Sequence, residues 1–425
     1  MIATTLCGAG VSVLGADDHV ASSAFAASGP KGCMACGGAT QVVLRLDGGR
    51  TISSLGRVLD AEAEVRLCDD CSHCQTHPSI DLGPYYASEY KTLAASDTED
   101  DLYELSNGVP LYRGQHMANV LAATLDRLGR LKPGLRLLDF GCGKALAMQH
   151  LQARLPLTAV HLYDVSRDYV HFWDAFVPAS HQACHEMPQD WAGSFDVVTS
   201  FFSLEHVAEP AAELQRIRHG LNDHGVLYAV VPNMYSHGIG DMLVVDHVQH
   251  YSELSMRRLL LSVGFELLVV DHESHNQGSI YVARKAEPVS NGGRSADVHA
   301  WGQRARDIAS FWAAFNASLH AFEGRHDQEH KRFHIAGAGF LGSYVFSRLR
   351  APERLAGFID SNHHKQRKGW QSKPVLAPGT LVAGPDTIVL SGLNAEQEET
   401  ILPALLPVGI RREAVWGMRG VQPLR

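Results

Sequence analysis

Residues Leu137 to Gly143 read LLDFGCG, the most informative stretch of the chain. The apolar start predicts a buried strand that ends in Asp139, and Gly141 and Gly143 predict a turn that opens directly into a helix. Glycine lets the backbone pass close to a ligand, and an acidic side chain at a strand end can bind a cationic or hydroxyl-bearing group. This stretch therefore predicts a ligand site at the carboxyl end of the strand.

A second acidic residue follows the next predicted strand. HLYDVS ends in Asp164, whose carboxylate is positioned to accept hydrogen bonds from two ribose hydroxyls. Further strand candidates are SFDVVTSFFSL and GVLYAVVPN, spaced so that helices fit between them. Strands that alternate with helices imply an α/β fold with a doubly wound parallel sheet and helices on both faces.

These features resemble the class I S-adenosylmethionine-dependent methyltransferases, in which a D/E-x-G-x-G turn is followed by an acid after the second strand. FDVVTSFFSLEHVAEP resembles the fourth strand and following loop of that family, and HGVLYAVVPN resembles the fifth strand. The resemblance implies that S-adenosylmethionine is bound by Asp139, Gly141, Gly143 and Asp164. The alternative is another nucleotide-binding doubly wound domain.

Five of the eight cysteines fall between Cys33 and Cys74, in the segments CMACG and CDDCSHC. Paired C-x-x-C knuckles at this separation suit tetrahedral coordination of zinc by thiolates. The predicted ligands are Cys33, Cys36, Cys68 and Cys71. Four sulfurs fill the coordination shell, so we expect a structural Zn²⁺. There are three alternatives: a zinc site whose second knuckle is Cys71 with Cys74, a redox pair, and chance clustering.

Composition excludes several classes. Among 425 residues, Lys and Arg total 37 and Asp and Glu total 46, and the net charge of −9 disfavours broad binding of nucleic-acid polymers. No apolar run approaches the roughly 18 residues of a membrane-spanning helix. The first residues lack a positive start, and Asp17 and Asp18 interrupt their apolar stretch, so we expect a cytoplasmic protein with a flexible leader rather than a signal peptide.

The patterns divide the chain into four segments. We expect a flexible leader over residues 1–30, a zinc-binding module over 31–95, the methyltransferase core over 96–287, and a helix followed by a Rossmann-like unit over 288–425. The helix is predicted because apolar side chains trace one face: Trp301, Ile308, Phe311, Trp312, Phe315, Leu319 and Phe322.

A second glycine turn opens the C-terminal unit. GAGFLG places Gly337, Gly339 and Gly342 after the strand FHIA and before a helix, and Asp360 follows at the end of the next strand. By itself this is a dinucleotide fingerprint. The turn has three alternative roles: it binds a nucleotide diphosphate, it is purely structural, or it binds NAD(P). The segment HHKQRK, which includes Lys365, is either a phosphate contact or an ordinary solvated basic loop.

The order of segments resembles the three-domain, zinc-containing sugar C-methyltransferases, which act on nucleotide-linked 4-keto-6-deoxysugars. The supporting stretches are VRLCDDC, FFSLEHVAEP, VVDHVQHYS and FIDSNHHKQRKGWQSKPVLAP. The resemblance implies a small-molecule substrate, with its nucleotide held by Gly337, Gly339, Asp360 and Lys365. The GAGFLGS turn lacks the lysine that the family usually carries there. The protein is expected to be a monomer or a homodimer.

Methylation of carbon requires a base next to an acidic C–H and a hydrogen-bond donor for the developing enolate oxygen. The resemblance implies His247 as the base, Asp246 as its orienting or hydrogen-bonding neighbour and His206 as a donor or enolate stabiliser, with the two histidine roles open to exchange. The tyrosine of the family falls at Tyr85 or Tyr86, over the cofactor or the substrate.

The chain departs from the family pattern near these residues. Asp246 replaces the usual Glu, and His250 and Tyr251 occupy a stretch that is usually apolar and aromatic. Methylation of oxygen or nitrogen would need the same histidines only as simple bases, so an O- or N-methyltransferase is one alternative. A bifunctional or regulatory protein that binds NAD(P) through GAGFLG is another.

Overall fold

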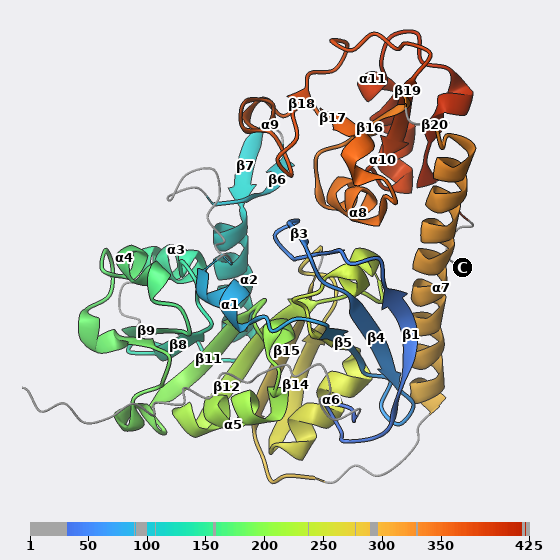
Figure 1. Cartoon of the computed structure of the whole chain (residues 1–425). Helices are drawn as coiled ribbons and strands as arrows, with labels where there is room; N and C mark the ends of the chain where they lie inside the picture. Colours follow the sequence, from blue (N-terminus) through green and yellow to red (C-terminus); the bar gives the residue numbers. More distant parts are fainter. Residues whose placement is uncertain are drawn as a thin grey trace, which may run out of the picture.

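The computed structural model describes residues 32–88, 90, 100–106, 108–155, 159–236, 238–276, 278–289, 296–328, 330–418 and 421. The expected leader, residues 1–30, lies outside the described residues. Three sheets of four or more strands organise the described residues. One long helix runs along the N-terminal sheet up to the C-terminal unit (Figure 1).

The central sheet has seven strands in the order β10-β9-β8-β11-β12-β15-β14. In that order the strands span Gln182–Cys184, Ala159–Asp164, Arg136–Phe140, Phe195–Phe201, Leu221–Pro232, Gly278–Lys285 and Phe265–Asp271. The first five are parallel, and β15 runs antiparallel to both of its neighbours. This mixed sheet confirms the class I methyltransferase fold, and the antiparallel strand corrects the wholly parallel sheet that alternation alone predicts.

Both faces of the central sheet are buried. Leu138 and Val198 pack in one apolar core, while their strand neighbours Leu137 and Val197 pack in another, as expected when successive side chains point to opposite faces. The covering helices are α2 (Arg113–Arg127), α3 (Leu146–Arg154), α4 (Val170–Trp173), α5 (Pro210–Gly220) and α6 (Glu253–Ser262).

The sheet of the cysteine-rich segment takes its last strand from the methyltransferase core. Its order is β1-β4-β5-β13, with bounds Thr40–Leu46, Ala63–Cys68, Cys74–Pro78 and Gln249–His250. β13 pairs antiparallel with β5, so that His250 lies opposite Cys74. A small hairpin of β2 (Thr51–Ile52) and β3 (Val58–Leu59) and the short helix α1 (Gly83–Ser88) complete this part.

The C-terminal unit is a parallel sheet in the order β18-β17-β16-β19-β20. Its strands span Val375–Leu376, Leu355–Ile359, Arg332–Ala336, Thr387–Ser391 and Val415–Trp416. Its helices are α8 (Phe340–Arg348), α9 (His363–Lys368), α10 (Ala395–Thr400) and α11 (Leu402–Leu405). Parallel strands joined through helices agree with the Rossmann-like unit expected here.

Helix α7 (Ala296–Arg325) connects the two ends of the molecule (Figure 1). Its apolar face enters one core that includes Leu44 and Val65 of the N-terminal sheet and Phe333 and Ile335 of the C-terminal sheet. The helix residues in that core include Ile308, Trp312, Phe315, Leu319 and Phe322. The predicted helix face is therefore confirmed, and it joins the N- and C-terminal sheets into one packed body.

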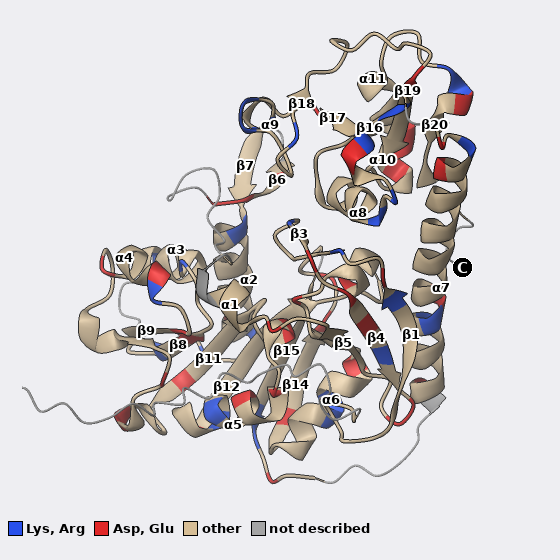
Figure 2. Cartoon of the chain, in the orientation of Figure 1, with Lys and Arg blue, Asp and Glu red and all other residues tan. Residues whose placement is uncertain are grey.

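Charges of both signs are interspersed on the surface. On β4, Arg66 pairs with Glu64 at 2.9 Å, and blue and red residues lie close together along this sheet (Figure 2).

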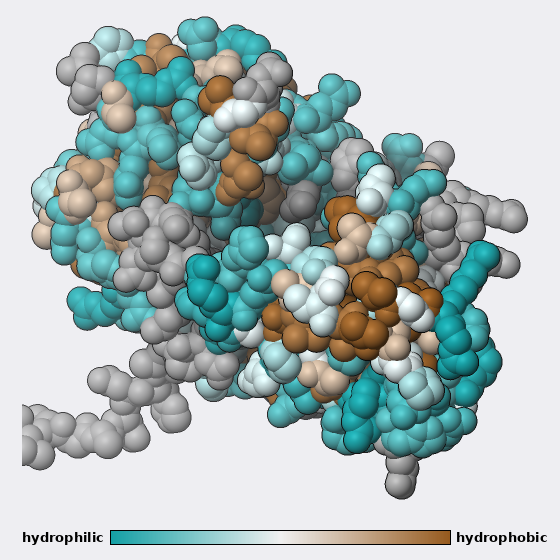
Figure 3. Space-filling view, turned by 90° about the horizontal axis from the view of Figure 1, so that it is seen from above, coloured by the Kyte–Doolittle hydropathy of each residue, from teal (hydrophilic) through white to brown (hydrophobic). Residues whose placement is uncertain are grey.

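Hydrophobic residues gather in one area of the face seen from above (Figure 3). In the C-terminal unit Val382 and Val408 are 72% and 61% exposed. Within the described residues, no helix has the length and apolarity needed to cross a membrane.

The hairpin β6–β7 (Leu102–Ser106 and Val109–Tyr112) precedes α2. Leu105 and Val109 are 62% and 67% exposed on it.

Candidate functional site

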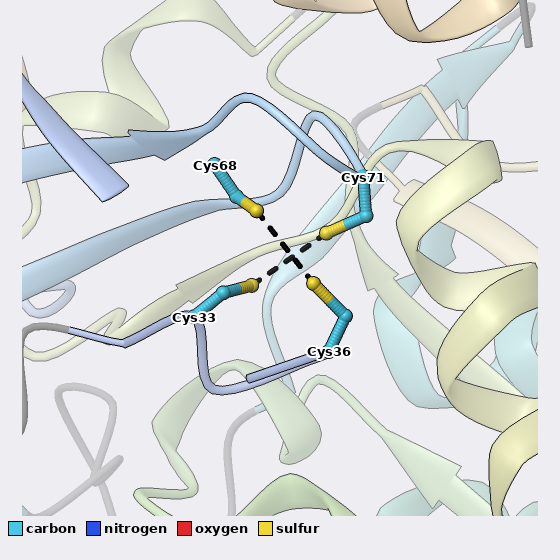
Figure 4. Close-up of side chains that lie close together, drawn as sticks. All are labelled: Cys33, Cys36, Cys68 and Cys71. Carbon is cyan, nitrogen blue, oxygen red and sulfur yellow. Dashed lines mark hydrogen bonds between the residues drawn. The ribbon is translucent and has the colours of Figure 1, made fainter. Parts of the chain in front are cut away.

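Four cysteine sulfurs converge where the first knuckle faces the turn between β4 and β5 (Figure 4). The Sγ atoms of Cys33 and Cys71 are 3.5 Å apart, and those of Cys36 and Cys68 are 3.6 Å apart. A tetrahedron with Zn–S bonds of about 2.3 Å places its sulfurs about 3.8 Å from one another. The donor set and its spacing therefore fit a structural zinc ion, as the sequence predicts.

Cys74 lies outside this group. It starts β5, is fully buried, and packs in the core shared with α7. Burial raises the pKa of its thiol to about 12, which suits a neutral core residue rather than a thiolate ligand. The structure thus groups Cys71, and not Cys74, with the first knuckle.

The first glycine turn lies at the carboxyl end of β8. Gly141 has φ of +72°, and a Cβ at this position would lie 2.1 Å from Oγ of Ser203. Only glycine therefore fits, and the turn packs directly against the loop that follows β11. This cradle of bare backbone suits a ligand such as S-adenosylmethionine.

The two acidic residues of this site hold defined positions. Asp164 ends β9, and one carboxylate oxygen accepts a 2.8 Å hydrogen bond from the backbone N–H of Gly143. Asp139 accepts a 2.7 Å hydrogen bond from the hydroxyl of Thr199 on the neighbouring strand. Burial raises the pKa of Asp139 to about 7 and outweighs the hydrogen bond from Thr199, which lowers this pKa. Burial also raises the pKa of Asp164. A direct hydrogen bond therefore joins Asp164 to the first glycine turn, and the role of these residues in binding S-adenosylmethionine stays a prediction.

His206 lies in the single 3-10 turn (Leu204–His206) that follows β11. Its Nδ1 lies 2.9 Å from the carbonyl oxygen of Asp246. Because a carbonyl only accepts, Nδ1 carries the hydrogen and Nε2 keeps its lone pair, toward which the hydroxyl of Tyr90 lies at 3.3 Å. Burial, helped by the charge of His247, lowers the pKa of His206 to about 4. This imidazole is therefore neutral near pH 7.

His247 is in the opposite charge state. Its Nδ1 donates a hydrogen bond to the carboxylate of Asp241. Burial lowers the pKa of His247, but the charge and hydrogen bond of Asp241 outweigh burial and raise that pKa to about 9. The other oxygen of Asp241 accepts from Nδ1 of His250 at 2.7 Å. The rings of His247 and His206 are perpendicular, with centroids 4.7 Å apart.

The expectation for Asp246 needs a correction. The residue that hydrogen-bonds to His247 is Asp241, because the fully buried carboxylate of Asp246 is committed elsewhere. Asp246 accepts hydrogen bonds of 2.7 Å from both the backbone N–H and the hydroxyl of Ser54, in the loop between β2 and β3. It therefore ties the histidine segment to the β2–β3 hairpin, and its backbone carbonyl orients His206.

Of the two candidate tyrosines, Tyr86 reaches the histidines. Its hydroxyl donates a 3.0 Å hydrogen bond to the carbonyl of Asp246 and lies 3.1 Å from Nδ1 of His206. Tyr85 is buried and packs in a small apolar cluster with Leu82 and Val248. The rings of Tyr86 and Tyr90 meet at 5.2 Å, edge to face.

The second glycine turn has the geometry of a dinucleotide fingerprint. Gly337 and Gly339 form the turn between β16 and α8, and a Cβ at Gly342 would lie 2.1 Å from the carbonyl oxygen of Gly337. Asp360, after β17, accepts a 2.8 Å hydrogen bond from the backbone N–H of Ala338 within the turn.

Lys365 also reaches this second turn. Its Nζ donates to the carbonyl oxygen of Ala338 at 2.5 Å and lies 4.9 Å from the ring centre of Trp370. Trp370 lines a cleft of about 360 Å³ between the β2–β3 loop and the segment after α9, together with Arg57 and Gln371. Of the predicted nucleotide residues, Lys365 thus contacts Trp370, which lines this cleft.

Four residues of the site were missed by sequence reasoning. Asp241, Ser54 and Tyr90 reach the histidines only through the fold, and no motif spacing indicates them. Glu205 directly precedes His206 in the segment LEH, and this adjacency was the only signal in the sequence. The structure adds that Glu205 is buried, with 1% of it exposed.

Comparison with known proteins supports the central sheet as a methyltransferase domain. Residues 113–270 match a family model described as methyltransferase domain. A ubiquinone biosynthesis O-methyltransferase of Xanthomonas campestris pv. campestris (strain B100) is 34% identical over 103 residues, which make up 23% of this chain and 42% of that protein. Proteins of the same name from strains 8004 and ATCC 33913 match equally. The chain spans less than half the length of these relatives.

Solved structures of methyltransferases are also similar. A complex of the Haloferax volcanii Trm112 methyltransferase activator with a methyltransferase matches at 17% identity, covering 42% of this chain and 92% of that chain, with a TM-score of 0.35. The CurJ carbon methyltransferase matches at 16% identity, covering 40% and 54%, with a TM-score of 0.33. The plantazolicin methyltransferase BpumL in complex with SAH matches at 13% identity, covering 41% and 84%, with a TM-score of 0.34.

Proposed function

We propose that this chain is an S-adenosylmethionine-dependent methyltransferase that forms a carbon–methyl bond on a nucleotide-linked keto-deoxysugar. The observation that carries the proposal is the position of His206 and His247 beside the first glycine turn. β8 and β11 are neighbouring parallel strands, so the turn after one and the histidine loop after the other meet at the same edge of the sheet. A methyl donor and its acceptor bound there would be in contact.

The chemistry sets what the protein must supply. S-adenosylmethionine, held by the residues of the first glycine turn and by Asp164, supplies an electrophilic methyl group on a positively charged sulfur. In-line displacement neutralises that charge, so the protein mainly positions the two reactants. Carbon becomes nucleophilic only after loss of a proton next to a carbonyl group. The site therefore needs a neutral base and a donor for the enolate oxygen.

The charge states of the two histidines support His206 as the base and His247 as the donor. His206 is neutral near pH 7 and carries its lone pair on Nε2, 3.3 Å from the hydroxyl of Tyr90, whereas His247 is protonated and fixed by Asp241. This is the exchange of roles that the sequence left open. Tyr86, Tyr90 and the Asp246 carbonyl orient the base.

The other two parts of the molecule support a bound sugar nucleotide. The zinc-binding segment holds β5, on which β13 forms, and β13 immediately follows the loop of His247. A structural zinc there would hold the donor histidine in place. At the other end, the cleft beside Lys365 and Arg57 offers positive charge for a diphosphate group.

A deuterium-exchange experiment tests this proposal. dTDP-4-keto-6-deoxyglucose, or its UDP counterpart, is incubated in heavy water with the enzyme and S-adenosylhomocysteine. We expect loss of the proton at C3, which lies next to the keto group, because the base acts even when no methyl group is present. Absence of exchange across a panel of keto-sugar nucleotides would rule out carbon methylation.

A second candidate is O-methylation. It is favoured by the name of the relatives that are 34% identical over 103 residues, which are ubiquinone biosynthesis O-methyltransferases. A hydroxyl acceptor needs His206 only as a simple base and needs no donor for an enolate. NMR of the methylated product separates the two candidates, since a methyl group on oxygen and one on carbon resonate at different positions.

A further inference from the structure

The turn after β11 carries a buried carboxyl group that the acid–base assignment above does not use. Glu205 directly precedes His206 and is 1% exposed. Within the described part of the chain, its Oε2 has no hydrogen-bond partner. Leaving a buried polar group unsatisfied costs roughly 1–3 kcal/mol, and more for a charged one. A carboxyl group in this position points to a proton or a ligand that it receives during the reaction.

Glu205 is close to both histidines. One side-chain atom from each of Glu205, His206 and His247 lies within 4.8 Å of the others. One water molecule or one substrate hydroxyl spans such a distance. Burial raises the pKa of Glu205 to about 8, whereas the pKa of His206 is lowered to about 4. A proton shared between these two groups therefore rests on the carboxylate.

We propose that Glu205 accepts the proton that His206 removes from the substrate, an inference that rests on the methyl transfer proposed above. The substrate C–H bond breaks, its electron pair stays on the substrate as the enolate, and the proton moves to Nε2 of His206. The enolate carbon then bonds to the methyl carbon while the S–C bond breaks and leaves its electron pair on sulfur. The imidazolium passes its proton to Glu205, which releases it to solvent when the product leaves.

The relay removes a repulsion within the buried site. His247 is already protonated, and its ring centroid is 4.7 Å from that of His206. Two imidazolium rings at this separation repel strongly where the dielectric constant is low. Transfer of the new proton to Glu205 returns His206 to its neutral state, and the anionic carboxylate becomes a neutral acid. The base is thus free for the next substrate.

Several titratable groups face Glu205. They are His206 of its own turn, Asp241 and His247 of the loop before β13, Arg113 at the start of α2, and Tyr86, Tyr90 and Tyr251. The three tyrosines have raised pKa values and stay neutral, and among the carboxyl groups and histidines named here the pKa values raised above 7 are those of Glu205 and His247. The exchange rate should therefore rise as Glu205 ionises near pH 8 and fall as His247 loses its proton near pH 9.

The test follows C3 exchange of dTDP-4-keto-6-deoxyglucose in heavy water across this pH range, with S-adenosylhomocysteine present. Glu205→Gln is compared with Glu209→Gln, which alters an exposed carboxylate in the same loop. We expect E205Q to lower the rate about tenfold or more and to abolish the rise toward pH 8. E209Q should keep both, and Glu205→Asp, which restores a carboxylate, should recover part of the rise. Binding of S-adenosylhomocysteine should be equal in all variants.

Distinct results would overturn the relay. E205Q with the wild-type rate, or with a lower rate but the wild-type pH profile, would show that Glu205 is only structural. A second metal ion per chain, lost in E205Q and needed for exchange, would show that the three side chains hold a metal instead. If the wild-type enzyme exchanges no proton on any keto-sugar nucleotide, the proposed carbon methylation fails and the relay fails with it.

Discussion

Asp241 joins two histidines, one just before β13 and one within it: one carboxylate oxygen accepts from Nδ1 of His247 and the other from Nδ1 of His250. Nε2 of His250 lies 2.8 Å from the hydroxyl of Thr76, on β5 of the cysteine-rich segment. One buried carboxylate therefore fixes both the charge of His247 and the attachment of its loop to the N-terminal sheet.

Replacing this carboxylate should move the alkaline limit of activity. In Asp241→Asn the charge that raises the pKa of His247 is gone, so burial lowers that pKa toward or below its ordinary value of 6.5. The donor histidine then loses its proton at lower pH, and kcat should fall at least one pH unit earlier than the wild-type fall near pH 9. A pH profile of kcat measures this. Asp223→Asn, at an exposed position, should leave the limit unchanged, and an unmoved limit in D241N would contradict the role of His247 as donor.

The ion pair between Asp241 and His247 should also contribute to the free energy of unfolding, within a defined pH range. The pKa of His247 is raised to about 9 from 6.5, so its contribution is fully present below pH 6.5 and is lost as pH rises through 9. The pKa of Asp241 is lowered from 3.8, so its contribution is present above that value and is lost in acid. We expect D241N to lower the free energy of unfolding by about 3 kcal/mol between these limits and by less at pH 9.5. Urea denaturation at several pH values measures the difference.

The part of the site that sequence alone predicts is the part that short segments carry. The glycine turn with Asp139, the acid Asp164 and the two cysteine knuckles each depend on a strand end or on a local spacing, and the structure brings their members together. The apolar strands that flank the turn also predict a doubly wound fold, because such strands must be covered by helices on both faces of the sheet.

The remaining features depend on contacts between distant segments. Ser54 and Asp246 meet because Ile52, at the end of β2, forms a bridge with Val244, and no periodicity in either segment encodes that pairing. Asp241 is only six positions from His247, but the loop between them has no regular repeat from which their contact could be read. The antiparallel strand β15 was missed since its apolar run, buried on both faces, has the pattern of a parallel strand.

Metal analysis should find one zinc ion per chain. Cys71→Ser should lose it, because three remaining thiolates leave the shell incomplete, and should also lower kcat by loosening the sheet on which β13 forms. Cys74→Ala should keep the zinc, since its thiol lies in the apolar core. Zinc content by inductively coupled plasma spectrometry decides this, and loss of zinc in C74A with retention in Cys68→Ser would support the register that uses Cys71 with Cys74.

Binding of S-adenosylhomocysteine should depend on Asp164. Asp164→Ala removes the carboxylate expected to accept hydrogen bonds from the ribose and also frees the N–H of Gly143. We expect the Kd to rise by about 10- to 100-fold, the effect of about 1–3 kcal/mol. Isothermal titration calorimetry measures the Kd. Asp168→Ala, at an exposed position after the same strand, is the matched control and should bind as the wild type does.

The C-terminal cleft should bind a nucleotide diphosphate through Lys365. The ammonium group lies between the carbonyl of Ala338 and the ring of Trp370, so it can turn toward a phosphate in the adjoining cleft without losing its position over the indole. Calorimetry with dTDP and UDP should give binding to the wild type that weakens about tenfold in Lys365→Ala, the loss expected for one charge-assisted contact. Lys368→Ala, an exposed lysine of the same helix, should bind normally. NADH and NADPH should give no heat; if instead they bind, and Asp360→Ala abolishes that binding, the second glycine turn holds a dinucleotide and the clamp for the sugar nucleotide must lie elsewhere.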